Sequence, residues 1–257
     1  MYPLIFQWGD AALTTYSFLV SLAFFVGLGV WIWQGKRFGL KAEALVNLSL
    51  LAFFLGWLGA RLLFMAVAWE DFFEGTLSPF HIWQGGVVYL GGFGAAFLGL
   101  YFLMPRLGVN RYHGFVSAAP ALCFAHALGR LGCFFNGCCH GSTCHLPWAI
   151  TYTDPLSAAP LGMALHPSQL YEVIGLTFLG LVLVWNNQKG ILRIASYKVY
   201  LLCYGTLRFF VEYTRGDLLR GALGPFSTSQ WLSLSLILAA LFLDFPRPND
   251  HNRAHES

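Results

Sequence analysis

The sequence predicts an all-α polytopic membrane protein with about seven transmembrane helices, an outward-facing N-terminus and an inward-facing C-terminus. Three observations predict this class: the composition, the length of the apolar runs, and the uneven charge of the segments between them. Hydrophobic residues make up 57% of the 257 residues and charged residues only 11%, whereas a soluble domain carries about 25% charged residues. This composition argues against a soluble enzyme, a disordered protein and a nucleic-acid binder. The net charge of +3 is too small to indicate a polyanionic partner.

Each predicted span is a continuous apolar run close to the ~20 residues that a helix needs to cross the hydrocarbon core of a bilayer. A membrane β-barrel would instead show alternating segments of ~10 residues. The third and fourth runs are glycine-rich or short, so broken or re-entrant helices are an alternative there. In chain order, the expected spans are Ala12–Trp33, Ala44–Trp69, Val87–Met104, Gly114–Leu128, Leu170–Trp185, Tyr197–Tyr213 and Ser229–Phe245.

The charges between the spans predict the orientation, because loops rich in Lys and Arg remain in the cytoplasm. Alternate connections are acidic or nearly neutral, with Asp10, Glu70, Asp71 and Glu74. The basic positions are Lys36, Arg37, Lys41, Arg106, Arg111, Lys189, Arg193, Lys198, Arg247 and Arg253. We therefore expect one transmembrane domain over residues 1–245, with an outer-face segment at about 133–167, and a cytoplasmic tail at 246–257.

Charged side chains within the predicted spans are the first functional candidates, since a charge at the centre of a membrane helix costs ~2.5–3.5 kcal/mol on insertion scales. Arg61 lies in the second span, Arg130 follows the fourth, and Arg208 and Glu212 lie in the sixth. Arg208 and Glu212 are four residues apart, so they could simply neutralise each other. That pairing leaves Arg61 and Arg130 unexplained. Three arginines at membrane depth indicate a buried anion, and guanidinium binds phosphate in a bidentate geometry.

Helical spacing groups further polar residues around these arginines. Tyr204, Arg208, Glu212 and Arg215 are spaced to share one face of the sixth span, and His126 is one turn before Arg130.

Two more segments carry polar or glycine-rich signals. Gly91 and Gly92 fit either close helix packing or irregular backbone that lines a cavity. His166-Pro167-Ser168-Gln169-Leu170-Tyr171-Glu172 opens the fifth span, where proline signals a helix start.

The segment from Gly129 to Gly141 resembles the signature of the bacterial prolipoprotein diacylglyceryl transferases. The matching positions are Gly129-Arg130-Leu131-Gly132, Phe134, Asn136-Gly137 and Gly141. Further segments agree with the family in order: Tyr16, Gly59-Ala60-Arg61, Gly85 to Gly92, His166 to Glu172, and Tyr204 to Asp217. The resemblance extends from Tyr16 to about Gln230.

The resemblance implies an enzyme of the bacterial inner membrane. Such an enzyme moves the diacylglyceryl group of phosphatidylglycerol onto the lipobox cysteine of a signal-peptide-bearing preprolipoprotein, forms a thioether and releases glycerol phosphate. Its partners are membrane lipid and the preprolipoprotein, and it needs neither a metal nor a nucleotide cofactor. By resemblance, Arg130 and Arg208 handle the phosphate, with Tyr16, Arg61, Asn136, Gly141, Tyr204 and Glu212 in support. We add Gly91, Gly92, His166, Gln169 and Arg215 as substrate-binding candidates.

Four positions depart from the family pattern. Leu90 stands where the family usually has histidine, Cys133 and Cys138 replace an Asn and a Glu, and Val116 replaces an acidic residue. The usual candidate for the general base is therefore missing. His126 and His140 are the nearest replacements, because histidine accepts a proton near neutral pH. His166 is a third candidate.

Four of the six cysteines, Cys133, Cys138, Cys139 and Cys144, lie within twelve positions, with His140 and His145 among them. On an oxidising outer face a Cys133–Cys138 or Cys139–Cys144 disulfide is permitted. The cluster could instead consist of packed thiols, hold a zinc ion or take a direct part in catalysis. Its spacing does not match the paired CxxC knuckles of common zinc sites.

The alternative function is a family relative that has become a thiol-redox or metal-binding membrane protein through this cluster. A transporter or channel would predict an internal repeat or charges paired along a pore, and the sequence has neither.

Overall fold

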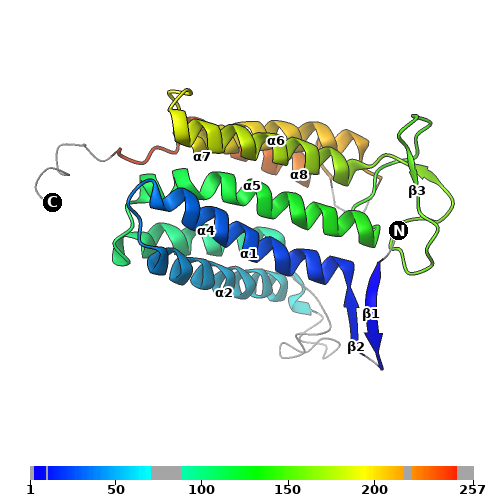
Figure 1. The fold of residues 1–257 in the computed structure, drawn as a ribbon. Helices are drawn as coiled ribbons and strands as arrows, with labels where there is room; N and C mark the ends of the chain where they lie inside the picture. The colour runs from blue at the N-terminus through cyan, green and yellow to red at the C-terminus, as the bar shows by residue number, and fades with distance from the viewer. Residues whose placement is uncertain (1–2, 10, 71–87, 217–221, 248–257) are drawn as a thin grey trace, which may run out of the picture. The chain divides into compact units, whose positions relative to one another are not determined.

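The computed structural model describes residues 3–9, 11–70, 88–216 and 222–247, and these residues are mostly helical (Figure 1). The described α-helices, in chain order, are α1 (Thr15–Lys36), α2 (Ala42–Val67), α4 (Tyr89–Arg106), α5 (Arg111–Asn136), α6 (Ser168–Lys189), α7 (Ser196–Val211) and α8 (Thr228–Phe242). Several positions used above lie outside the described residues: Asp10, Asp71, Glu74, Gly85, Gly86, Asp217, Arg253 and the tail from residue 248.

Four of these helices, α1, α2, α5 and α6, are long and apolar enough to cross a membrane, and α8 is a shorter apolar helix. The predicted class, a helical membrane protein, is therefore confirmed as far as helix content, length and apolarity are concerned. The alternative of broken third and fourth spans is wrong, because α4 and α5 are each one continuous helix. The predicted end of the fourth span at Leu128 is also wrong, since α5 continues to Asn136. The first eight residues of the signature are thus helical.

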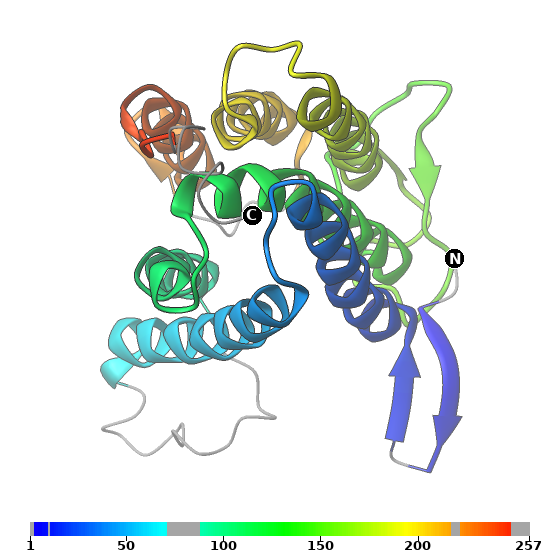
Figure 2. The ribbon, with the colours of Figure 1, turned by 60° about the vertical axis from the view of Figure 1, so that its left-hand side comes forward.

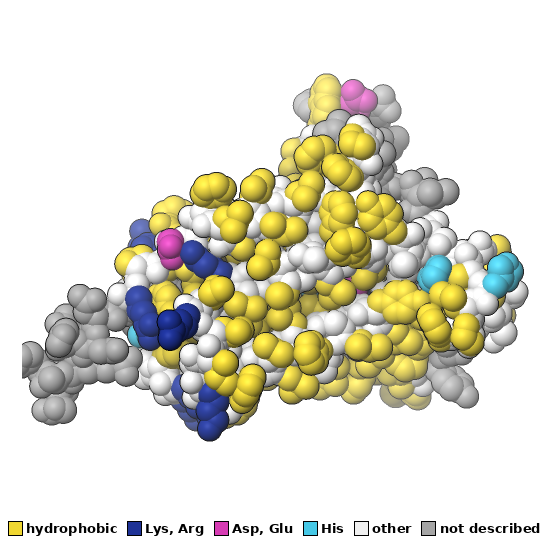
Figure 3. Space-filling model, turned by 90° about the horizontal axis from the view of Figure 1, so that it is seen from above, with side chains coloured by type: hydrophobic (Ala, Val, Ile, Leu, Met, Phe, Trp, Pro, Cys, Tyr) yellow, Lys and Arg dark blue, Asp and Glu magenta, His cyan; other side chains and the backbone are white. Residues whose placement is uncertain are grey.

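Helix α6 shows how these helices present apolar surface. Ile174, Phe178, Leu181 and Trp185 are all exposed, and their spacing places them on one face of the helix. Figure 3 shows hydrophobic side chains spread over the helical surface. A soluble monomer rarely exposes so large a contiguous apolar surface, and such a face is consistent with a helical membrane protein.

The chain divides into two compact units, and the first contains Met1–Gln34 and Phe115–Pro246. In this unit α7 packs between α6 and α8, and both views show the three helices running side by side (Figures 1 and 2). Helix α8 begins with a capping box: the hydroxyl of Ser227 accepts from the backbone N–H of Gln230, and the Gln230 side chain accepts from the N–H of Ser227. Such a box satisfies amide groups that the first helical turn leaves without partners.

The second unit holds Gly35–Gly114, and its main contact is between α2 and α4. Glycines make this contact possible. A Cβ at Gly91 would overlap the carbonyl oxygen of Gly59, and one at Gly92 would lie 2.8 Å from that of Gly56. Because Gly91 and Gly92 lie in regular helix, the packing alternative is confirmed over irregular backbone.

Short antiparallel strand pairs accompany the helices. They are β1 (Leu4–Trp8) with β2 (Ala11–Thr14), β3 (Ile150–Thr151) with β4 (Ala164–Leu165), and β5 (Ala222–Leu223) with β6 (Phe226–Ser227). The β3–β4 pair lies between α5 and α6 in the chain, where the fully buried Tyr152 packs with Ala159 and Leu165. The hydroxyl of Tyr152 donates to the carbonyl of Phe134 at 3.1 Å. This small core attaches the α5–α6 connection to the end of α5.

Candidate active site

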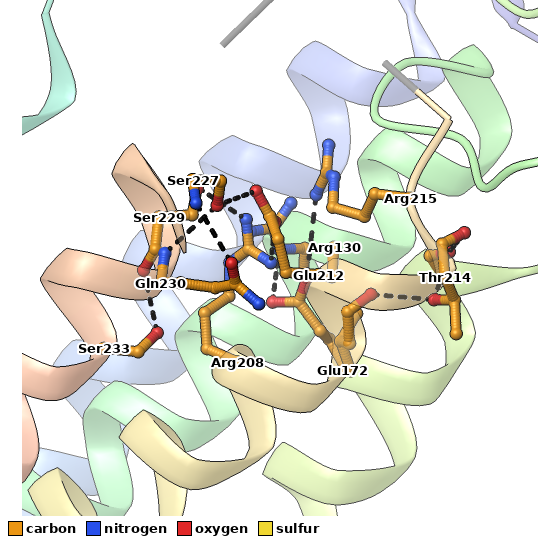
Figure 4. Close-up of polar contacts among 12 residues, drawn as sticks. Arg130, Glu172, Arg208, Glu212, Thr214, Arg215, Ser227, Ser229, Gln230 and Ser233 are labelled. Atoms are coloured by element: carbon orange, nitrogen blue, oxygen red, sulfur yellow. Dashed lines mark hydrogen bonds and ion pairs between the residues drawn. The ribbon is translucent and has the colours of Figure 1, made fainter. Parts of the chain in front are cut away.

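Glu172 lies at the centre of a buried ion-pair cluster. It sits in the second turn of α6 with a side chain that is 0% exposed, and its Oε2 lies 2.9 Å from Nε of Arg130 on α5. Its other oxygen lies 3.9 Å from Nη1 of Arg215. One carboxylate therefore holds two guanidinium groups from different segments of the chain (Figure 4).

A second ion pair lies beside the first (Figure 4). Nη1 of Arg208, in the last turn of α7, is 2.7 Å from Oε2 of Glu212, so the ion pair that their spacing allows is present. The same guanidinium donates through Nη2 to Ser229 at 3.0 Å, and the hydroxyl of Ser227 donates to Glu212 at 2.7 Å. The start of α8 thus fixes the orientation of both charged groups.

The cluster has an excess of positive charge. Among the residues labelled in Figure 4, Arg130, Arg208 and Arg215 carry three guanidinium groups and Glu172 and Glu212 carry two carboxylates. Arg215 also contacts the thiol of Cys139. The guanidinium groups thus outnumber the two carboxylates by one. A net cation held out of bulk water attracts an anion much more strongly than the same charge on an exposed surface.

The predicted single helical face through Arg215 is wrong, because α7 ends at Val211. Glu212–Thr214 form a 3₁₀ turn, and Arg215 follows with extended backbone. The hydroxyl of Thr214 donates to the carbonyl of Val211 at 2.8 Å, which satisfies an acceptor at the helix end. Arg215 therefore reaches Glu172 from the extended segment after this turn and not from the helix.

Backbone hydrogen bonds join three segments around the cluster. The N–H of Gly141 donates to the carbonyl of His166 at 3.1 Å, and that of Ser142 donates to the carbonyl of Thr214 at 2.8 Å. Ser168 adds a hydroxyl bond to the same Thr214 carbonyl at 3.1 Å. The segment at Gly141 and Ser142, the start of α6 and the turn that follows α7 are thereby held together.

Gly141→Ala is expected to destabilise this junction by about 1–3 kcal/mol, the usual cost of overpacking. A Cβ at Gly141 would overlap the Cβ and carbonyl oxygen of His166 and lie 2.6 Å from Oγ of Ser168. The matched control is Gly129→Ala in the same signature, where nothing lies within 4 Å of the added atom. Thermal unfolding in detergent should show a lower melting temperature for Gly141→Ala only; equal melting temperatures would mean that Gly141 is not needed for packing.

Three thiols gather around the end of α5. The sulfur atoms of Cys133, Cys138 and Cys139 all lie within 4.8 Å of one another, and no cysteine in the described structure forms a disulfide. Hydrogen bonds from the thiols of Cys133 and Cys138, together with the guanidinium of Arg215, lower the pKa of Cys139. Cys144 is buried and free and does not belong to this group.

The candidate bases differ in their surroundings. Nδ1 of His140 lies 2.9 Å from the carbonyl oxygen of Gly141. A carbonyl only accepts, so Nδ1 carries the proton and Nε2 is left as the basic nitrogen. His126 packs edge-to-face against Tyr204 at 5.0 Å between ring centroids. Nδ1 of His166 lies 3.2 Å from the Tyr171 hydroxyl.

Three more predicted substrate-binding residues of the first unit lie around the signature. Tyr16 packs on Gly132, where an added Cβ would be 3.3 Å from the Tyr16 ring. Asn136 is the last residue of α5, and its carbonyl accepts from Ala158 at 2.9 Å. Gln169 is buried and donates to the carbonyl of Cys138 at 2.9 Å.

The remaining predicted residues, Arg61, Gly91 and Gly92, belong to the second unit. Arg61 is buried on α2, and its guanidinium carbon lies 5.4 Å from the centre of the Phe64 ring. Gly91 and Gly92 take part in the α2–α4 packing described above. Their predicted contact with substrate remains a prediction.

Sequence reasoning missed Glu172 as a site residue, although it lies in the polar segment that opens α6. The signal was present: a carboxylate within an apolar span needs a cationic partner. The hydroxyls of Ser227, Ser229 and Thr214 carried no such signal, because serine and threonine are common at helix ends.

Comparison with known proteins places this geometry in a family. The sequence model described as prolipoprotein diacylglyceryl transferase matches residues 3–245. The chain is 29% identical over 231 residues to phosphatidylglycerol–prolipoprotein diacylglyceryl transferase 2 of Clostridium perfringens, and the match covers 89% of each chain. It is 31% identical over 252 residues to the phosphatidylglycerol–prolipoprotein diacylglyceryl transferase of Streptococcus suis, and this match covers 95% of this chain and 91% of the relative. The protein with this buried arginine cluster therefore belongs to the prolipoprotein diacylglyceryl transferase family.

Proposed function

We propose that this protein transfers the diacylglyceryl group of phosphatidylglycerol to the lipobox cysteine of preprolipoproteins in the bacterial inner membrane. The observation that carries the proposal is the buried cluster in which Arg130, Arg208 and Arg215 outnumber Glu172 and Glu212. The relatives named above supply the two substrates, since their names specify phosphatidylglycerol and prolipoprotein.

The reaction suits a site built from arginines. The substrate thiolate attacks the glyceryl carbon that carries the phosphate ester, a carbon–sulfur bond forms, and the carbon–oxygen bond breaks. Negative charge then accumulates on the departing glycerol phosphate. Guanidinium groups that are already in position stabilise this charge without reorganisation. Arg130 and Arg208 are proposed to contact the phosphate, while Glu172 and Glu212 hold them in place.

The thiol proton needs an acceptor, and His140 is our first candidate. Its Nδ1 is occupied by the carbonyl of Gly141, so Nε2 is available to accept the proton. His126 is the second candidate, because it lies one helical turn from Arg130 on α5. We assign Tyr16, Gln169 and Tyr204 to positioning the lipid or the peptide.

The proposed topology has about seven spans, with the N-terminus outside and the C-terminus inside. Reporter fusions should place Lys36–Lys41, Arg106–Arg111 and Lys189–Arg193 in the cytoplasm, because these segments are basic. Fusions within Ser142–Ala164 should report an outside location. A cytoplasmic location for Ser142–Ala164 would overturn the orientation and place the three thiols in a reducing compartment.

Complementation tests the function in a cell. A bacterium depleted of its own diacylglyceryl transferase should grow again when this protein is expressed, and its lipoproteins should regain the diacylglyceryl group. The control is the Arg111→Lys variant. Arg111 binds the carbonyl and ring of Tyr101 outside the cluster, so this variant should also restore growth. Failure of the well-expressed wild-type protein to restore either growth or lipid modification would contradict the proposal.

A further inference from the structure

We propose that Cys133, Cys138 and Cys139 form a binding site for one closed-shell, thiophilic metal ion, Zn(II) or Cu(I). The observation behind it is the gathering of three sulfur atoms within 4.8 Å of one another. Metal binding goes beyond the proposed transferase activity, and it can be measured independently of transfer.

The backbone is shaped to bring these thiols together. Cys133 lies in the last turns of α5, and the chain turns back through Gly137, which has φ +78°. Cys139 follows with φ +61° and is the one non-glycine residue with a positive φ in the described part of the chain. A left-handed backbone costs a residue with a Cβ about 1–2 kcal/mol. Such costs persist mainly at functional sites, and here the unusual conformation points the third thiol at the other two.

The separation of the sulfur atoms suits a shared ion. With a Zn–S distance of about 2.3 Å, two sulfur ligands of one ion lie roughly 3.8–4.0 Å apart. The present sulfur atoms are within 4.8 Å of one another, so each needs to move by less than about 1 Å to bind the same ion. A hydrogen bond already holds Cys138 close to Cys133: the Cys138 thiol donates to the Cys133 carbonyl oxygen at 3.8 Å.

The ligand chemistry selects the class of ion. All three donors are sulfur, and thiolates favour Zn(II) and Cu(I) over Mg²⁺ or Ca²⁺. Binding displaces the thiol protons to solvent, since the thiolate is the ligand. Three thiolates carry more negative charge than either cation carries positive charge. The guanidinium of Arg215, which contacts Cys139, offsets part of this difference.

A disulfide explains the arrangement less well. A disulfide would use only two of the three gathered sulfur atoms, whereas a metal ion uses all three. The neighbouring Cys144 is the natural comparison. It lies five residues beyond Cys139 and is buried, but it is not within the group.

The test measures metal binding by the full-length protein, purified in detergent, fully reduced and free of metal under anaerobic conditions. Zn(II) and Cu(I) are titrated in separate arms, each against a chromophoric chelator for that ion. We expect one equivalent of at least one ion per chain in the wild-type protein. Cys133→Ser, Cys138→Ser and Cys139→Ser should each lose this stoichiometric binding. Cys144→Ser and the exposed-site variant Cys203→Ser should retain it.

Thermal unfolding provides a second readout that does not depend on any one variant. An ion that binds only the folded state raises the melting temperature, so the ion should stabilise the wild-type protein and not the triple serine variant. The proposal is overturned if wild-type protein with titratable thiols binds neither ion, if binding persists in the triple variant, or if two of the thiols form a disulfide that excludes the ion. Since the ion itself is measured, the result is independent of whether transfer occurs.

Discussion

Arg130→Lys and Arg208→Lys are each expected to lower the rate of diacylglyceryl transfer by about 10²–10³, equivalent to about 2.7–4 kcal/mol, by analogy with the loss of one oxyanion-hole donor. Lysine keeps the charge but cannot reproduce the planar, bidentate contact of guanidinium with phosphate. Arg208 also uses separate nitrogens for Glu212 and Ser229, and an ammonium group on a flexible stem cannot hold both partners in that geometry. The measurement is the initial rate of transfer of labelled diacylglyceryl to a lipobox peptide.

Folding must be separated from catalysis in these variants. The control is Arg111→Lys, which loses a 2.7 Å hydrogen bond to the Tyr101 carbonyl and a contact with the Tyr101 ring. We expect Arg111→Lys to affect the melting temperature in detergent more than the transfer rate, and the two cluster variants to show the reverse. Normal transfer by Arg130→Lys or Arg208→Lys would remove that arginine from the proposed contact with phosphate.

Glu172→Gln is expected to cause the largest loss of stability in the molecule. Removing one partner of a buried ion pair costs about 3–5 kcal/mol, because the remaining charge stays buried without compensation. Here one substitution leaves both Arg130 and Arg215 without their carboxylate. The melting temperature in detergent should fall sharply.

An exposed ion pair and a double variant make this test specific. Asp244→Asn breaks the contact between Lys198 and the exposed Asp244 and should change the melting temperature little. Combining Glu172→Gln with Arg130→Met should recover part of the lost stability, because the second substitution removes one of the buried charges that the first leaves uncompensated. The effects of two interacting residues are therefore not additive. If Glu172→Gln melts like the wild-type protein, Glu172 does not hold the cluster together.

The predictable part of the fold depends on hydropathy. Apolar runs located the helices because lipid imposes a similar length on every span. The ends of the helices were harder to predict, since they depend on local hydrogen bonds. Helix α5 continues through the signature to Asn136, and α7 ends at Val211 and passes into a 3₁₀ turn. Neither ending follows from hydropathy alone.

The candidate site was predictable where charge lies in an apolar context. Arg130, Arg208 and Glu212 stood out for that reason, and the structure brings them together. The partner of Arg130 was not predictable from helical spacing, because Glu172 is on another helix. The cluster of three thiols was only partly predictable from the sequence. The spacing showed four neighbouring cysteines, whereas the backbone turn at Gly137 and Cys139 decides which three meet.

The most direct test of the proposed function is transfer by the purified protein in detergent, with phosphatidylglycerol labelled in its diacylglyceryl group and a synthetic lipobox peptide. Mass spectrometry should find the diacylglyceryl thioether on the peptide cysteine, together with an equal amount of glycerol phosphate, and a peptide with serine in place of that cysteine should give neither. A folded wild-type protein that forms no thioether under these conditions, or that releases glycerol phosphate equally with the serine peptide, would contradict the proposed function.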